Sequence, residues 1–143
     1  MEPEVFTAPW AEAWCAELNA SAAYREAAAR WEGALVLVMQ ADPAMGIADP
    51  RSLYLDLHHG ECRLARPATT DDTGAAPFVL EATPAVWKRV LEGRLDPLLG
   101  LMTGKVRLSR GSLAKLTPQV QAAKELVRSA ARLATTFPPG WQT

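Results

Sequence analysis

The sequence predicts an α+β domain in which five strands form a mainly antiparallel sheet covered by helices. Two observations support this fold class. Five short segments carry the alternating or continuous apolar patterns of strands, and helical spacing is confined to the two chain ends and to the region after the fourth strand. Segregated strands and helices are typical of α+β domains. The 143 residues contain no internal repeat or linker, so we expect one domain over residues 1–143.

The first part of the chain predicts a pair of helices over residues 9–31. Pro9 suits a first helical turn, where its missing N–H costs nothing, and Trp14 lies on the apolar stripe that follows. Ser21 is the expected N-cap of the second helix, whose body is rich in Ala. Gly33 is expected to end that helix.

The strands come next. Residues 34–40 are apolar on both faces, which indicates a central strand, whereas residues 53–59 alternate between apolar and polar. The segments 42–50 and 67–77 are rich in turn residues and are predicted to be loops. The five expected strands are residues 34–40, 53–59, 62–66, 78–82 and 105–110.

Two helix-start signals follow the fourth strand. Thr83-Pro84 and Asp96-Pro97 each place a capping side chain before a proline. The second signal opens an almost wholly apolar helix over residues 98–102. We expect this helix to be covered by protein or by a bound apolar molecule, because an exposed patch of this kind would be an association site. A closing helix is predicted from about residue 118 to about residue 134.

Composition limits the function classes. The net charge of −1 shows no excess of positive charge that would indicate binding to nucleic acid or to an anionic membrane. No apolar run is long enough to span a bilayer. The N-terminus is acidic and lacks the regions of a signal peptide, so we expect a cytoplasmic protein. Cys15 and Cys62 are too few for a disulfide framework and are expected to be two reduced thiols.

The polar residues do not assemble a known catalytic site. His58 and His59 are neighbours on a strand and should point to opposite faces, so we expect no metal site. Cys62 would need an orienting partner to act as a nucleophile, and Asp71-Asp72 lies in a turn-rich segment typical of solvated carboxylates. The sequence also lacks the phosphate-binding, nucleophile-elbow and zinc-protease motifs, so neither catalysis nor a cofactor is expected.

The region from Trp87 to Gly111 resembles the sterol carrier protein 2 (SCP2) family. It contains a Trp-bearing helix that ends at Gly93, then a short apolar helix, a Gly104-Lys105 turn and a strand that alternates apolar and basic residues. The resemblance extends loosely over residues 33–127. It implies a five-stranded sheet backed by helices, with an apolar tunnel that binds sterols, fatty acids, fatty acyl-CoA or other lipids without catalysis.

The resulting function hypothesis is a non-enzymatic carrier of an apolar small molecule or lipid. Arg107 and Arg110 are candidates to contact an anionic head group, although a solvated strand face also explains them. One alternative is an interaction module, a homodimer included, in which the tunnel is closed. Another is an enzyme that uses Cys62, His58 or His59 on a lipid or thioester. The expected tunnel lining is Leu37, Met39, Leu55, Phe78, Leu80, Trp87, Leu91, Leu98, Leu101, Met102, Val106 and Leu108.

Overall fold

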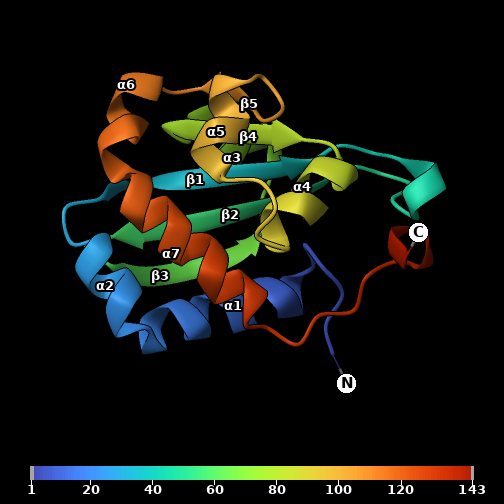
Figure 1. Ribbon diagram of the computed structural model, residues 1–143, viewed down its shortest axis with the longest axis horizontal. Coiled ribbons are helices and arrows are strands. Elements are labelled where there is room, and N and C mark those ends of the chain that lie inside the picture. Colours follow the sequence, from blue (N-terminus) through green and yellow to red (C-terminus); the bar gives the residue numbers. More distant parts are fainter. Residues whose placement is uncertain (1, 143) are drawn as a thin grey trace.

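The computed structural model describes residues 2–142 and contains a sheet with helices at both ends of the chain (Figure 1). The strands are β1 (Glu32–Met39), β2 (Arg51–His58), β3 (Glu61–Pro67), β4 (Phe78–Ala82) and β5 (Arg107–Arg110). The α-helices are α1 (Ala8–Ala20), α2 (Ala22–Ala27), α3 (Thr70–Ala75), α4 (Pro84–Leu91), α5 (Pro97–Met102), α6 (Leu113–Leu116) and α7 (Val120–Ala131). Short 3-10 turns are η1 (Pro43–Met45), η2 (Thr117–Gln119) and η3 (Pro139–Gln142).

The five strands form one mixed sheet in the order β3-β2-β1-β4-β5. β1 runs parallel to β4, and the other neighbouring strands are antiparallel. Leu35 of β1 lies opposite Leu55 of β2 and Phe78 of β4, while Leu37 lies opposite Leu53 and Leu80. This register places one set of apolar side chains on one face of the sheet. The predicted α+β fold with a five-stranded, mainly antiparallel sheet is confirmed.

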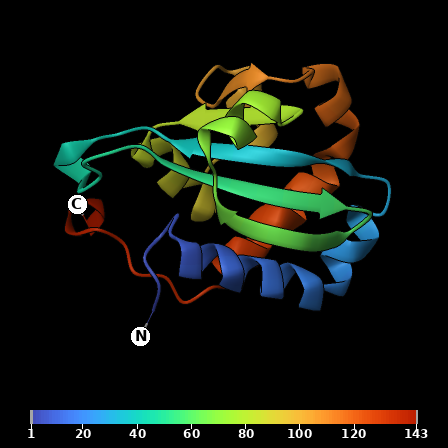
Figure 2. The same ribbon diagram turned by 180° about the vertical axis from the view of Figure 1, so that it is seen from behind.

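The two faces of the sheet are covered differently. α4, α5 and α7 lie across one face, and α1 runs beside β3, as Figure 1 shows. The opposite face carries α3 and otherwise remains open in the reverse view (Figure 2). The large core lies on the helix-covered side, and a small cluster around Val36, Ala76 and Val79 lies on the other. No helix in the described part of the chain is long and apolar enough to cross a bilayer.

Two predicted segments differ from the structure. α2 ends at Ala27, and Gly33 lies inside β1 at φ 141° instead of ending the helix. A Cβ at Gly33 would make only an ordinary van der Waals contact with the Phe78 ring, at 3.5 Å, so it is the positive φ that favours glycine here. The predicted loop over residues 67–77 contains α3, which begins with a capping box between Thr69 and Asp72.

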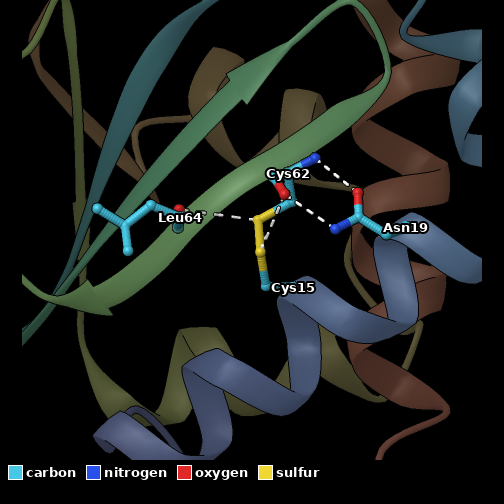
Figure 3. The surroundings of a disulfide bond; sticks show 4 residues. All are labelled: Cys15, Asn19, Cys62 and Leu64. Atoms are coloured by element: carbon cyan, nitrogen blue, oxygen red, sulfur yellow. Dashed lines mark hydrogen bonds between the residues drawn. A yellow bond between two sulfur atoms is a disulfide. The ribbon is translucent and has the colours of Figure 1, made fainter.

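The prediction of two reduced thiols is wrong. A disulfide joins Cys15 of α1 to Cys62 of β3, with a Cα–Cα distance of 5.4 Å (Figure 3). The side chain of Asn19, one helical turn further along α1, accepts a 2.9 Å hydrogen bond from the Cys62 amide and donates another to its carbonyl. α1 is therefore fixed to the edge of the sheet by a covalent bond and by two polar contacts.

Candidate functional site

The most conspicuous site is an apolar cavity between the helix-covered face of the sheet and α4, α5 and α7. Its volume is about 100 Å³. Of its twenty lining residues, all except Gln119 are apolar or aromatic. Those lining residues are Phe6, Trp14, Tyr24, Trp31, Leu35, Leu37, Leu57, Leu80, Trp87, Val90, Leu91, Pro97, Leu98, Leu101, Leu116, Gln119, Ala122, Ala123, Leu126 and Val127. Such a surface can recognise little except an apolar molecule.

Three tryptophans give the cavity apolar walls because their polar edges are bonded to backbone. The indole N–H of Trp14 donates to the Leu126 carbonyl at 3.1 Å. Trp31 and Trp87 donate to the carbonyls of Gly33 and Val38, each at 2.9 Å. Each ring is thereby held in place by its nitrogen, and the rest of the indole is left for apolar contact.

Tyr24 and Gln119 are the polar side chains of the lining that make no hydrogen bond within the described residues. Tyr24 is 2% exposed, and burial raises the pKa of its phenol well above the usual range. The hydroxyl therefore stays protonated across physiological pH and can donate a hydrogen bond. Gln119 can both donate and accept. Both residues belong to the otherwise apolar lining of the cavity.

The structure brings half of the predicted lining residues to this cavity. These six are Leu37, Leu80, Trp87, Leu91, Leu98 and Leu101.

The other six lie elsewhere. Met39 and Leu55 are fully buried, because the core on this side of the sheet extends beyond the cavity walls. Phe78 packs on Trp31 with ring centroids 5.1 Å apart, and Leu108 is half-buried against the same core. Val106 is buried against α5, where a Cβ on Gly100 would lie 3.0 Å from its Cγ2 atom.

Met102 differs most from its expected position, because 70% of it is exposed. α5 turns Leu98 and Leu101 toward the cavity, and Met102 follows on the outer side of the helix. The expectation that this apolar helix is fully covered is therefore wrong. Arg107 and Arg110 are also exposed and do not line the cavity, and the Arg110 guanidinium donates to the Gly74 carbonyl.

Sequence reasoning missed the walls contributed by the chain ends. Trp14, Tyr24 and Trp31 line the cavity from the N-terminal region, and Leu126 and Val127 line it from α7. All five belong to apolar positions at helical spacing or next to a helix end, which marks them as core without showing that the core is hollow.

The cavity wall is less buried where the helices α4, α5 and α7 form it, and Leu91 on α4 is half-buried. The lining residues Leu98 and Leu101 on α5 are half-buried, as are Leu126 and Val127 on α7. The walls from α1, α2, β1 and β2 are buried. A ligand that entered with the least rearrangement would therefore separate α5 from α7.

Cys62 and Asp72, two of the candidate reactive residues, are engaged in structural contacts. Cys62 is in the disulfide and has no thiolate to offer. Asp72 caps α3 and pairs with Arg66, and both contacts lower the pKa of its carboxyl.

The two histidines do meet, contrary to the geometric argument from the sequence. His59 leaves the strand at φ 51°, so its ring lies 4.1 Å from that of His58, measured between centroids. Both rings approach the Glu32 carboxylate, at 3.0 Å from His59 and 3.7 Å from His58. All three side chains retain solvent exposure, and the hydrogen bond from His59 lowers the pKa of Glu32.

Comparisons with known proteins agree on one family. The model of the SCP-2 sterol transfer family matches residues 12–122. A crystal structure of sterol carrier protein 2 is 47% identical, covering 92% of this chain and 100% of that chain with a TM-score of 0.82. The solution structure of a conserved hypothetical protein from Thermus thermophilus, described as possibly a sterol carrier protein, is 46% identical, covering 93% and 92% with a TM-score of 0.83.

More distant structures share the fold. Sterol carrier protein 2 from Yarrowia lipolytica, in its apo form, is 17% identical, covers 85% of this chain and 88% of that chain, and has a TM-score of 0.58. A search of curated proteins gives no significant match.

Proposed function

Since this chain belongs to the SCP-2 sterol transfer family, we propose that it carries one long apolar lipid in the cavity and has no catalytic activity of its own. Family membership supports lipid binding or transfer in general. That the ligand is one long apolar lipid, that the cavity is its binding site and that the protein has no catalytic activity are our proposal. The supporting observation is the cavity wall, in which nineteen of twenty residues are apolar or aromatic. Binding would be driven by removing apolar surface from water, at about 25 cal/mol per Å².

The cavity must expand to hold such a ligand. Its volume of about 100 Å³ is smaller than the roughly 300–1,000 Å³ of typical small-molecule sites. α5 is a short helix that is separated from α7 along the chain by β5, α6 and η2, and both helices contribute half-buried lining residues. We therefore infer that the cavity widens on loading, when α5 moves away from α7.

The polar end of the ligand is assigned to Tyr24 and Gln119. A phenol donor and an amide would suit a carboxyl or hydroxyl group, and neither side chain has another hydrogen-bond partner within the described residues. Arg107 and Arg110 are exposed outside the cavity. A role for them in contacting a head group remains a prediction.

The test combines native mass spectrometry of protein purified from cells with titration of a fluorescent fatty acid. We expect a retained lipid, or saturable binding at one site per chain. Leu101→Arg should abolish binding, because the new side chain enters the cavity and can extend toward its opening. The matched control is Leu64→Arg, since Leu64 is 45% exposed on β3, away from the cavity.

Two results would overturn the carrier proposal. The first is an absence of saturable binding across fatty acids, fatty acyl-CoA and isoprenoids. The second is a ligand-free homodimer, which would favour the interaction module. Hydrolysis of a lipid or thioester by pure protein would contradict the proposed lack of catalysis. A cytoplasmic location also remains a prediction, and the Cys15–Cys62 disulfide argues against it because cytosolic thiols are usually kept reduced.

A further inference from the structure

The outer surface of α5 and its neighbours is unusual in two ways that the cavity does not explain. α5 is apolar on both sides, with Leu98 and Leu101 facing the cavity while Leu99 and Met102 face outward. Four of the six large apolar residues that the structure leaves exposed fall within residues 93–124. They are Leu99 at 51%, Met102 at 70%, Leu113 at 38% and Val120 at 39% exposed.

The same segment is strongly basic. Residues 93–124 contain six cations and only one carboxylate, that of Asp96. This gives a charge of +5, whereas the remainder of the chain carries −6. The Asp96 carboxylate accepts hydrogen bonds from the Leu98 and Leu99 amides as the cap of α5. All six cations are exposed: Arg94, Lys105, Arg107, Arg110, Lys115 and Lys124.

Most of these cations have no anionic partner. Of the six, only Arg94 forms an ion pair within residues 2–142, with Glu92 at 3.8 Å. Outside the segment the fraction is higher, because five of the nine cations are paired with carboxylates: Arg51, Arg63, Arg66, Arg128 and Arg132. The positive charge around α5 is therefore available to an external anion.

The two features lie together in space. Figure 1 shows β5 and α6 along the upper edge of the molecule and α5 just below β5 on the helix-covered side, and Figure 2 shows β5 and α6 at the same edge from behind. Lys105 follows α5 in the chain, and Lys115 lies on α6 together with Leu113. We call the exposed residues Leu99, Met102, Lys105, Leu113 and Lys115 the α5–α6 face.

We propose that the α5–α6 face docks on the surface of an anionic lipid bilayer. Apolar side chains that project among cations are the arrangement by which peripheral proteins bind such surfaces. The apolar groups enter the interface, and each cation near the surface adds roughly a fivefold gain in affinity. The net charge of −1 conceals this face, because the acidic remainder of the chain cancels it. A lipid surface fits better than a second copy of the chain, since two copies would place like charges opposite each other.

Docking would also serve the carrier function, and this part of the inference rests on the proposed function. α5 forms the cavity wall with one side and the docking surface with the other. A bilayer that draws Leu99 and Met102 into its interface would pull α5 away from α7. The opening of the cavity would then face the lipid that is to be taken up or released.

The experiment is co-sedimentation of the intact protein with two kinds of vesicle, pure phosphatidylcholine and phosphatidylcholine mixed with phosphatidylglycerol. We expect binding to the anionic vesicles that weakens at high ionic strength, with little binding to the neutral ones. Leu99→Asp and Met102→Asp should each weaken binding about tenfold or more. Leu64→Asp is the matched control, because it changes an exposed Leu outside the face.

The role of charge is tested with a double variant that combines Lys105→Glu and Lys115→Glu. We expect its affinity for the anionic vesicles to fall more than tenfold. Arg30→Glu is its control, since Arg30 is exposed just after the end of α2 and lies outside the face. Circular dichroism checks that every variant is folded, which is expected because the substituted side chains are exposed.

Three outcomes would overturn the proposal. The first is no sedimentation with anionic vesicles, and the second is equal binding to both vesicle types. The third is a loss of vesicle binding in the two control variants that equals the loss in the variants of the α5–α6 face. A concentration-dependent dimer that Met102→Asp disrupts would assign the face to a second copy instead. Fatty-acid binding measured without vesicles tests the carrier function separately, so the two proposals can fail independently.

Discussion

Filling the cavity from α7 distinguishes a hollow site from solid core by the sign of the stability change. Ala123 is half-buried, lies on α7 and lines the cavity. Ala123→Leu adds three carbon atoms at a helical position where both residues have high propensity. If those atoms enter empty space, each buries apolar surface worth about 0.8 kcal/mol, which gives a gain of about 1–2 kcal/mol after allowance for partial exposure.

The assay is thermal unfolding beside titration of a fluorescent fatty acid. For a domain of this size, that gain should raise Tm by about 3–6 °C. The same atoms would occupy the space that the acyl chain needs, so binding should fall by about tenfold or more. Ala11→Leu is the matched control. Ala11 is fully buried on α1 outside the cavity, and overpacking there should cost about 1–3 kcal/mol.

The reasoning would be refuted if Ala123→Leu lowered Tm as Ala11→Leu does, because the site would then be packed core. It would also be refuted if the filled variant bound the fatty acid with unchanged affinity, because the ligand would then occupy another site.

Three further predictions concern the anchor, the disulfide and α3. Tyr24→Phe should leave Tm nearly unchanged while weakening the binding of fatty acids by up to about tenfold, as fluorescence titration would show, because one hydrogen bond to the ligand is lost. Cys62→Ser should lower the free energy of unfolding in urea by about 4 kcal/mol, since the bond to Cys15 spans 47 residues of sequence, yet ligand binding should persist. Asp72→Asn should lower Tm at neutral pH. Because Arg66 depresses the pKa of Asp72 in the folded state, the stability it adds is present above the ordinary carboxyl pKa of about 4 and lost on acidification, so Tm scans of both proteins should converge at low pH.

The elements were predictable where a local interaction decides them. Ser21, Thr83 and Asp96 each cap the helix expected from the sequence. Each side chain accepts a hydrogen bond from a backbone N–H only two or three residues ahead, so the interaction can be recognised in the local sequence. α3 was missed although its capping box, Thr69 with Asp72, was present in the sequence. The turn-rich composition of that segment concealed a helix of only six residues.

The sequence predicts an apolar cavity, but it does not show which apolar side chains line it. Leu37 and Met39 share a face of β1, and nothing local distinguishes them. Leu37 lies opposite Leu80 of β4 and reaches the cavity, whereas Met39 lies opposite Ala82 and is covered by the core. Which apolar side chain meets empty space depends on strand register and on helices far away in the sequence, so periodicity alone cannot resolve it.

α5 shows why averages over the whole chain conceal a functional surface. Its sequence is apolar in every direction, and burial against the cavity accounts for Leu98 and Leu101 but not for Leu99 and Met102. A helix that needed only to close the cavity could carry polar residues at both outer positions without loss of packing. The exposed apolar pair lies beside unpaired cations, and a net charge of −1 hides that local excess. One short helix thus joins the ligand site to the proposed bilayer contact, and we expect ligand exchange to be faster with anionic vesicles present than in their absence.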